Sequence, residues 1–450
     1  MSIPAYSTYK DSSVEWLGEV PTDWVVSKLG YFFREPPCYG VLVPDFENDG
    51  VPMLRITDME HEFIDTSGLV TISAGLSAQY SRTIVKEGDV VLSLVGTIGK
   101  AFEVGPKLAG VNLSRAIARI QLDDNTLPRY LCWIFQSRAF THFIDLVCRG
   151  TAQRVLNLSD LSAFSFVFPT YVEQSSISAF LDYETARIDA LIEEQQRLIE
   201  LLKEKRKALI SLAVTRGLDP TVLMKDSGVE WLGEVPAHWT IKKGGHIGML
   251  FGSEAVPEGM VNDYGNLPFL KVGSLSSDTL SIRQWDFFVD ESIERYYRPK
   301  SRFVVFPKRG AAIFLNKVNV VEVGALLDPN LMGWEMQAGN NAYYFASVLK
   351  CRGLSELADV STVPQINNKH ISPEKFPVPP YVEQNGIVAF LDTETFKFDQ
   401  LVTEAEHGVS LLQERRSALV SAAVTGKIDV RNWQPPASAQ APEPAVAEAD

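Results

Sequence analysis

The side chains best suited to chemistry in this chain are basic, aromatic and rich in hydrogen-bond donors, and they gather in short loops. Arg295–Arg302 reads RYYRPKSR and alternates cations with aromatic rings. Arg and Lys give sequence-independent attraction to a phosphate backbone. We therefore expect this segment, and the Lys308–Gly310 turn after it, to contact nucleic acid. The alternatives are a solvated loop for the first and a plain turn for the second.

Two segments in the first half of the chain carry a similar signal. Gly96–Lys100 reads GTIGK after an apolar run, and its glycines permit a tight turn with close backbone approach to a ligand. Arg149–Arg154 reads RGTAQR, and Arg and Gln are residue types that read guanine and adenine edges in the major groove. An ordinary hairpin is the alternative for Gly96–Lys100.

Arg55 and Lys271 lie in two similar strand-like runs, Pro52–Ile56 and Pro268–Val272, and a structural role is equally open for both. With these two included, the predicted nucleic-acid contacts are Arg55, Thr97, Lys100, Arg149, Gln153, Arg154, Lys271, Arg295, Tyr297, Arg298, Lys300, Lys308 and Arg309. No residue-to-base code is readable from these positions, so the nucleotide sequence they would select is not predicted.

Catalytic signatures are absent from the sequence. There is no GxxxxGK[ST] loop, no GxGxxG motif opening a helix and no HExxH pair, and the six histidines are scattered. No Glu-x-Lys pair occurs, which removes the usual half of one nuclease site. No [N/D/S]PP[Y/F] loop is present for amino methylation, since Asp328–Leu331 reads DPNL. We therefore expect no catalytic residue, no metal site and no cofactor bound by this chain.

The elements that would position these loops occur twice. Asp11–Trp24 reads DSSVEWLGEVPTDW and recurs as DSGVEWLGEVPAHW at Asp226–Trp239. Tyr171–Gln174 (YVEQ) recurs 210 positions later as Tyr381–Gln384. An internal repeat of this size predicts two similar folded units related by an approximate two-fold axis.

Two long stretches without proline, Glu173–Val214 and Glu383–Val424, predict helices of about 60 Å each. Their apolar residues fit a heptad frame, which needs a partner helix. The residues assigned to its a and d positions are Leu181, Ile188, Leu191, Leu198, Leu202, Leu209 and Leu212 in the first stretch, and Phe398, Leu401, Leu412 and Leu419 in the second. Gly408 should weaken the second helix by about 1 kcal/mol.

The expected fold is therefore mixed α+β, with two globular modules separated by two long helices packed as an antiparallel coiled coil. Within the modules, β-branched runs predict short strands, and one helix is expected near Arg129–Phe143. The predicted divisions are a repeated motif segment 1–24, a module 25–168, a helix 169–216, a linker motif 217–239, a module 240–378, a helix and end 379–433, and a disordered acidic tail 434–450.

Composition sets further limits. The formal net charge is −14, but the two modules are near neutral, and the acid lies in the helices, the repeated motifs and the tail. A near-neutral module can still present a basic face, whereas the acidic remainder suits a protein partner. Four cysteines without a CxxC pair argue against zinc or disulfides and fit a reducing compartment. No membrane span or signal peptide is recognisable, so we expect a cytoplasmic protein.

The duplicated modules, the EWLGEVPxxW motif ahead of each, and the YVEQ…FLD…ET helix sequence resemble the specificity (S) subunit of type I restriction–modification enzymes. The resemblance implies that residues 25–168 and 240–378 are target recognition domains, each reading half of an asymmetric bipartite site in double-stranded DNA. It also implies that the helices set the spacing of the two half-sites and dock two methyltransferase subunits, with restriction (translocase and nuclease) subunits joining them. S-adenosylmethionine, ATP and Mg would then be bound by those partners. The GTIGK segment resembles a loop common in such domains.

Three alternatives remain open from the sequence. The chain could be an S-like scaffold of a methylation-only or other DNA-modification system. It could be a hydrolase with an unrecognised site, which activity of the isolated chain would reveal. It could also be a structural coiled-coil adaptor, which predicts no DNA retention even with partners present.

Overall fold

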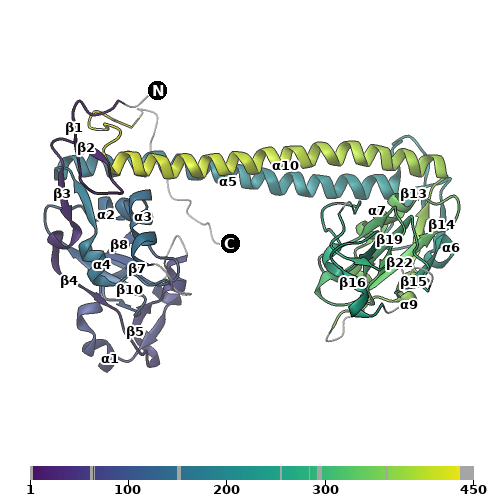
Figure 1. Cartoon of the computed structure of the whole chain (residues 1–450), viewed down its shortest axis with the longest axis horizontal. Helices are drawn as coiled ribbons and strands as arrows, with labels where there is room; N and C mark the ends of the chain where they lie inside the picture. Colours follow the sequence, from purple (N-terminus) through teal and green to yellow (C-terminus); the bar gives the residue numbers. More distant parts are fainter. Residues whose placement is uncertain are drawn as a thin grey trace. The chain divides into compact units, whose positions relative to one another are not determined.

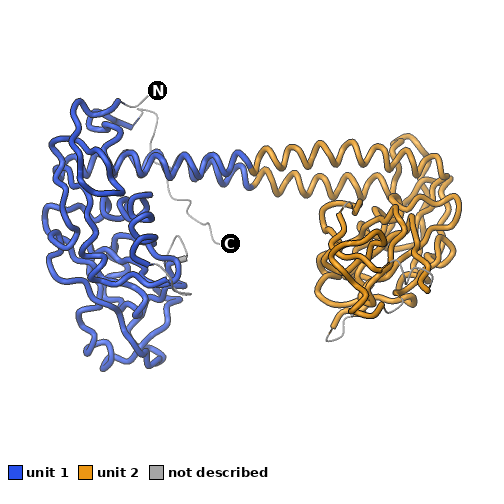
Figure 2. Tube along the Cα trace, in the orientation of Figure 1, with its two compact units in different colours: residues 1–196, 407–450 blue, residues 197–406 orange. Residues whose placement is uncertain are grey.

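The computed structural model describes residues 4–60, 64, 66–148, 154–253, 256–282, 284–290, 296–359 and 363–435. The chain divides into two compact units (Figure 2). Unit 1 is formed by Met1–Gln196 and His407–Asp450, and unit 2 by Arg197–Glu406. Two long helices, α5 (Tyr171–Arg216) and α10 (Tyr381–Val424), each contribute one part to unit 1 and the other part to unit 2.

Unit 1 is built around a four-stranded antiparallel sheet of order β4-β10-β7-β8, beside which lies a three-stranded sheet of order β6-β5-β9. Its strands are β1 (Tyr9–Asp11), β2 (Glu19–Pro21), β3 (Val25–Lys28), β4 (Phe33–Tyr39), β5 (Phe46–Leu54), β6 (Val70–Ile72), β7 (Val90–Ser93), β8 (Ala101–Glu103), β9 (Asn112–Leu113), β10 (Ile117–Leu122) and β11 (Ser165–Phe168). Its helices are α1 (Ala74–Gln79), α2 (Pro128–Phe135), α3 (Arg138–Val147) and α4 (Leu158–Ala163).

Unit 2 repeats this plan, with a four-stranded sheet of order β15-β22-β19-β20 and a second sheet of order β16-β18-β17-β21. Its strands are β12 (Met224–Asp226), β13 (Glu234–Pro236), β14 (Thr240–Lys243), β15 (Gly248–Gly252), β16 (Val261–Asn262), β17 (Leu267–Leu270), β18 (Phe288–Val289), β19 (Phe303–Pro307), β20 (Asn319–Val321), β21 (Leu326–Leu327), β22 (Leu331–Met336) and β23 (Lys375–Val378). Its short helices are α6 (Gly244–Ile247), α7 (Ala342–Arg352), α8 (Leu354–Leu357) and α9 (Asn368–Ile371). The mixed α+β class predicted from the sequence is confirmed.

Alternation along the central strands gives each sheet two buried faces. In β7, Val90 and Leu92 pack into the main core with α2 and α3, whereas Val91 joins a second core on the opposite face. In β19, Val304 and Phe306 face the core with α7, and Val305 faces the other. A strand buried on both sides reads as a continuous apolar run, which is how both appear in the sequence.

The single helix expected near Arg129–Phe143 is two helices, α2 and α3. Ser137 explains the break, because its hydroxyl donates to the carbonyl of Ile134 at 2.6 Å and accepts from the amide of Phe140 at 3.3 Å. A serine in this position caps a new helix rather than continuing the old one. In unit 2 the equivalent stretch is also two helices, α7 and α8, and Gly353 with φ of +83° separates them.

The repeat is recorded in matching hydrogen bonds. The Tyr130 hydroxyl donates to the carbonyls of Val167 and Val424, both at 3.2 Å, and the Tyr344 hydroxyl donates to those of Pro377 and Val214 at 3.4 and 3.0 Å. The buried Gln174 side chain accepts from the Leu127 amide at 2.8 Å, and Gln384 accepts from the Asn341 amide at the same distance. These bonds attach each module to the long helices. Equivalent residues of α2 and α7 are 214 positions apart in the sequence, and equivalent residues of α5 and α10 are 210 positions apart.

Within each unit the parts of α5 and α10 run side by side in opposite directions (Figure 1). Asp189 pairs with Arg416 at 2.8 Å in unit 1, and Asp399 pairs with Arg206 at 3.0 Å in unit 2. Asp399 stands 210 positions after Asp189, and Arg416 stands 210 after Arg206. The two ion pairs are therefore copies of each other, as the internal repeat of the sequence requires.

The helix seam differs in part from the predicted heptad frame. Leu181 and Ile188 are buried as expected, but Leu191, Leu198 and Leu212 are 45%, 43% and 54% exposed. The second buried line consists instead of residues such as Thr185, Ile199 and Ala213. Each of them lies four residues after an a position of the predicted heptad, whereas the predicted d positions lie three residues after it. The rotation of α5 is fixed at its start, where Ile177, Phe180 and Leu181 enter the module core. In α10, Leu401 is likewise exposed, at 48%.

Unit 1 is completed by both ends of the chain. The Tyr9 hydroxyl donates to the carbonyl of Gly426 at 3.0 Å, and the Asp429 amide donates to that of Pro4 at 2.7 Å. In unit 2 the chain passes directly from α5 to β12 and β13 at the equivalent corner. The repeated tryptophans anchor both corners: the indole of Trp24 donates to Glu173 at 3.2 Å and that of Trp239 to Glu383 at 3.0 Å.

Candidate nucleic-acid interface

The GTIGK segment of unit 1 is a tight turn between β7 and β8. Gly96 and Gly99 have φ of +70° and +100°, conformations that favour glycine. The Ser93 hydroxyl holds the turn from inside, donating to the carbonyl of Thr97 at 2.7 Å and accepting from the amide of Lys100 at 2.9 Å. The turn is therefore preorganised. The bonds that hold it use the Lys100 main-chain amide and not the Lys100 side-chain ammonium.

A second segment, just before α4, fastens to this turn. The Gly96 amide donates to the carbonyl of Arg154 at 3.3 Å, and the Leu156 amide donates to that of Leu94 at 2.9 Å. The structure thus brings Thr97, Lys100 and Arg154 together, as a common site would require. The Arg154 guanidinium also pairs with Asp145 at 2.8 Å, with both side chains about half exposed. The predicted contacts Arg149 and Gln153 lie outside the described residues.

Two cavities of about 560 and 630 Å³ lie at this turn, and Gly96, Thr97 and Lys100 line both. The smaller is completed by Gln136, Thr141 and Arg154, among others. The larger includes Tyr39, Leu42 and Arg115. These three residues were not predicted from the sequence, since each stands apart from any basic or aromatic run. For two of them the signal is position, because Arg115 lies two residues before the central strand β10 and Tyr39 ends β4.

Unit 2 builds the same junction from different side chains. Gly310 has φ of +87°, and its amide donates to the carbonyl of Pro364 at 3.1 Å. The Ile366 amide donates to that of Lys308 at 2.8 Å. These bonds repeat those of Gly96 and Leu156, so the two turns occupy equivalent places. Lys308 is half-buried and Arg309 is exposed at the turn.

Arg55 and Lys271 are engaged within the protein. The Arg55 guanidinium bonds Asp58 at 2.9 and 3.1 Å, and these hydrogen bonds raise the pKa of Arg55. The Lys271 ammonium lies 3.7 Å from the centre of the Phe287 ring, a cation–π contact. These contacts fit the structural role that the sequence left open for both residues, and their contact with nucleic acid stays a prediction.

The basic–aromatic segment of unit 2 is only partly outward. Lys300 pairs with Glu335 and lies over the Phe251 ring at 4.8 Å. Tyr297 packs against a small core that contains Leu267. Arg298 is exposed, and Arg295 lies outside the described residues. Among the predicted residues of this segment, the described one most open to a ligand is therefore Arg298.

Two further properties of the described residues concern metal binding and thiol chemistry. Within them, no group of three or more His, Cys, Asp or Glu side chains is placed to hold a metal ion. Burial raises the pKa of all four cysteine thiols, in Cys132 to about 12, so these thiols stay protonated. In the part of the chain that the structure describes, no helix has the length and apolarity needed to cross a membrane.

Comparisons with known proteins point in one direction. Residues 21–202 match the family model of the type I restriction modification DNA specificity domain. The type I restriction enzyme EcoBI specificity subunit of Escherichia coli is 26% identical over 198 residues, which are 43% of this chain and 42% of that protein. The match thus spans less than half of the relative's length.

Two solved structures share the fold. A chain from a structure described as the basis of complex assembly and conformational transition of the type I R-M system superposes with a TM-score of 0.67 at 18% identity, covering 91% of this chain and 99% of that one. The HsdS subunit from Thermoanaerobacter tengcongensis gives 0.53 at 17% identity, covering 91% and 98%.

Residues 21–202 thus match a DNA specificity domain. The family match over residues 21–202 and the curated relative both indicate a type I restriction–modification specificity subunit, and the two solved structures share the fold.

Proposed function

We propose that this chain is the DNA-reading subunit of a type I restriction–modification complex and binds an asymmetric site in two parts. The observation that carries the proposal is the repeated junction. Gly96 with Arg154 and Gly310 with Pro364 form the same hydrogen-bonded frame but carry different neighbours. Unit 1 presents Thr97 and Lys100 there, whereas unit 2 presents Lys308 and Arg309. Two recognition modules with the same backbone frame but different side chains suit a DNA site whose two halves differ in sequence.

The turn geometry suits close contact with a duplex. Each turn is held by main-chain bonds, so its backbone loses little freedom on binding. Cations at the turn supply phosphate affinity, and Arg309 has the fork geometry for guanine. Under this proposal the chain acts on DNA in the cytoplasm, and its candidate contacts are the predicted residues whose charges have no acidic partner described above, chiefly Lys100, Arg298, Lys308 and Arg309.

The proposal gives the chemistry to partners. The chain would bind no S-adenosylmethionine, ATP or Mg itself and would have no catalytic residue. It would present an adenine that is flipped into the pocket of a methyltransferase subunit. Restriction subunits, where the system has them, would join the same assembly.

Exposed leucines on the long helices support two docking places. Unit 1 exposes Leu191 and Leu411, at 45% and 51%. Their repeats, Leu401 and Leu201, are 48% and 47% exposed in unit 2. Single exposed leucines are ordinary, but the same pair left open in both units suits two copies of one partner.

Sequencing of modified adenines in cells that carry or lack the gene tests the proposal. We expect one methylated motif to disappear with the gene, and that motif should have two unlike blocks separated by a fixed number of unspecified base pairs. A palindromic motif, a single contiguous block, or an unchanged methylome would contradict it.

A further inference from the structure

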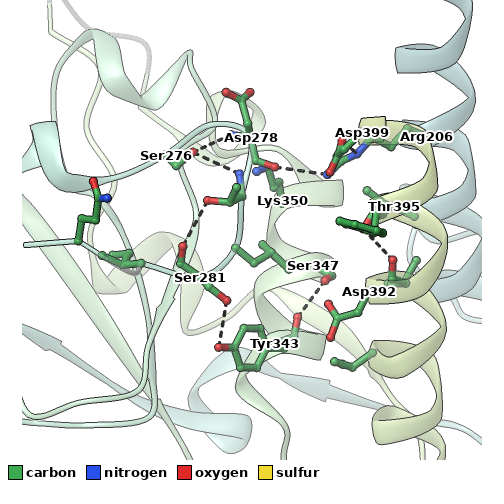
Figure 3. Close-up of a pocket in the computed structure, with 18 of the residues that line it drawn as sticks. Arg206, Ser276, Asp278, Ser281, Tyr343, Ser347, Lys350, Asp392, Thr395 and Asp399 are labelled. Carbon is green, nitrogen blue, oxygen red and sulfur yellow. Dashed lines mark hydrogen bonds and ion pairs between the residues drawn. The ribbon is translucent and has the colours of Figure 1, made fainter. Parts of the chain in front are cut away.

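A cavity of about 620 Å³ opens in unit 2 on the side of α7 that faces α10 (Figure 3). The loop between β17 and β18 forms one wall, with Asp278 and Asp286 among its residues. Lys350 of α7 and Asp392 of α10 line the other walls. The volume falls within the range of about 300–1,000 Å³ that is usual for small-ligand sites. None of the predicted nucleic-acid contacts that the structure describes lines this cavity.

The equivalent place in unit 1 is found from the hydrogen bonds that record the repeat. Tyr130 of α2 matches Tyr344 of α7. With the same offset of 214 positions, Arg129 matches Tyr343 and Trp133 matches Ser347. In the long helices, the FLD sequence that ends at Asp182 recurs with its aspartate at Asp392. The walls of the cavity formed by α7 and α10 therefore correspond to α2 and α5 of unit 1.

In unit 1 this place is occupied by side chains of the chain itself. Asp182 accepts hydrogen bonds from the Arg129 guanidinium at 2.8 Å and from the Trp133 indole at 3.1 Å. The guanidinium groups of Arg129 and Arg416 lie 4.9 and 5.9 Å from the centre of the Trp133 ring. Trp133 is only 2% exposed. The carboxylate thus holds a planar cation together with an aromatic ring.

In unit 2 the carboxylate is kept, but both of its partners are replaced. The Tyr343 hydroxyl lies 3.2 Å from that of Ser281, and the Ser347 hydroxyl donates to the carbonyl of Tyr343 at 2.9 Å. Neither reaches Asp392, and among the described residues Asp392 has no hydrogen-bond or ion-pair partner. Figure 3 shows its side chain lying beside α7.

The remaining charges make the cavity acidic. Arg206 is already paired with Asp399 at 3.0 Å, and its guanidinium also donates to the carbonyl of Asp278. Lys350 is the remaining cation among the described lining residues, against Asp278, Asp286 and Asp392. The aromatic rings of Tyr343 and Phe396 lie on the lining, and guanidinium groups stack well on such faces.

We propose that this cavity is a binding site for a guanidinium group, with Asp392 as its acceptor. The ligand fills in unit 2 the place that Arg129 and Trp133 fill in unit 1. Two sources offer this chemistry, namely an arginine side chain of a protein partner and a free small guanidinium compound. The proposal rests on the repeat and the cavity and does not depend on DNA recognition.

Saturation-transfer NMR with the full-length chain tests the proposal. The probe is N-acetyl-arginine amide, and its control is N-acetyl-citrulline amide, which has nearly the same shape without the charge. We expect transfer to the arginine probe and little to the citrulline one. Asp392→Asn should weaken binding by about tenfold or more, since the acceptor loses its negative charge and one of its two oxygens is replaced by an NH2 donor. The matched variant Asp182→Asn in unit 1 should leave binding unchanged.

A second variant fills the site. Tyr343→Arg with Ser347→Trp grafts the unit 1 pair beside Asp392, and it should abolish probe binding while raising the melting temperature. Equal transfer to both probes, or undiminished binding in both the Asn variant and the grafted variant, would overturn the proposal.

The source is settled by repeating the experiment on the complex purified with its partners. Loss of probe binding in the complex identifies a partner arginine as the occupant. Retained binding identifies a free guanidinium compound. Either result is compatible with the site, whereas absence of probe binding to both the free chain and the complex contradicts it.

Discussion

At the scale of single residues, a side chain's candidacy as a DNA contact depends on whether the protein already uses its charge. Arg55 and Lys300 have acidic partners in Asp58 and Glu335. Lys100 lines two cavities at a preorganised turn, and Arg309 is exposed at the equivalent turn. Charge and composition alone do not separate these pairs of residues, because the separation depends on contacts from distant parts of the chain.

Lys100→Gln should weaken DNA binding by the chain in its complex. Since one phosphate contact is lost, the slope of log K against log salt should fall in magnitude by about one. Titrations at several salt concentrations measure this slope. Lys10→Gln is the control, because the Lys10 ammonium is bonded to the Thr22 carbonyl at 2.7 Å, and it should leave the slope unchanged. Equal slopes for the native chain and Lys100→Gln would remove Lys100 from the interface.

The lowered pKa of Lys350 leads to a prediction about how the free energy of unfolding depends on pH. Burial, aided by Arg206, lowers the pKa of Lys350 from 10.5 to about 8. Between these values the unfolded chain binds a proton that the folded chain does not, so this residue's contribution to the free energy of unfolding rises with pH. Lys350→Met removes that contribution. Chemical denaturation at pH 7 and pH 10 should therefore show a larger gain for the variant at pH 7.

The opposing groups do not obscure this test. Cys132 and the buried tyrosines have raised pKa values, so they act in the other direction above pH 9. Because they are present in both proteins, they cancel in the comparison. An equal difference between native and variant chains at both pH values would show that the Lys350 amine titrates normally.

At the scale of elements, the long helices show how far a heptad pattern can be carried. The pattern predicted two long helices, and α5 and α10 are observed to pack together. It assigned Leu191, Leu198 and Leu401 to the seam, yet all three are exposed. Rotation about a helix axis is decided by packing against the modules, at Ile177 and Phe180 for example. Such packing cannot be read from one helix alone.

Gly408 lies inside α10, and a Cβ added there would meet no other atom within 4 Å. Gly408→Ala should therefore raise the free energy of unfolding by about 0.5–1 kcal/mol, since the unfolded chain loses freedom. Gly426→Ala is the opposite case, because its φ is +72° and its Cβ would lie 2.4 Å from Pro21 Cγ. Denaturant titration should show stabilisation by the first and destabilisation by the second, and destabilisation by both would refute the helix argument.

The exposed leucines lead to a prediction about stoichiometry. Leu411→Lys places a charge in one proposed docking face in unit 1, and Leu201→Lys does so at the repeated position in unit 2. Each variant should retain one methyltransferase subunit, and the double variant none, as measured by native mass spectrometry of the co-purified complex. Full occupancy in the double variant would place the docking surface elsewhere.

At the scale of the whole molecule, the internal repeat made the fold predictable. The repeated EWLGEVP and YVEQ motifs predict two units. The similar sequences preserve equivalent hydrogen bonds, which are made by Tyr130 and Tyr344 and by Gln174 and Gln384. The cavity of unit 2 was not predictable in this way. It arises where the units differ, at Trp133 against Ser347, and seeing it requires the alignment of the two modules in space.

Each module also begins and ends on one paired ladder. Val25 pairs with Phe168 through β3 and β11, and Thr240 pairs with Val378 through β14 and β23. Because the two ends of a module are neighbours, residues 240–378 can be exchanged for the corresponding segment of another family member with little disturbance of α5 and α10. The most direct test of two independent readers is to map the methylated sequence of the complex that carries this exchange. We predict that one block of the motif changes and the other is retained. An unchanged motif, or a change in both blocks, would contradict the account.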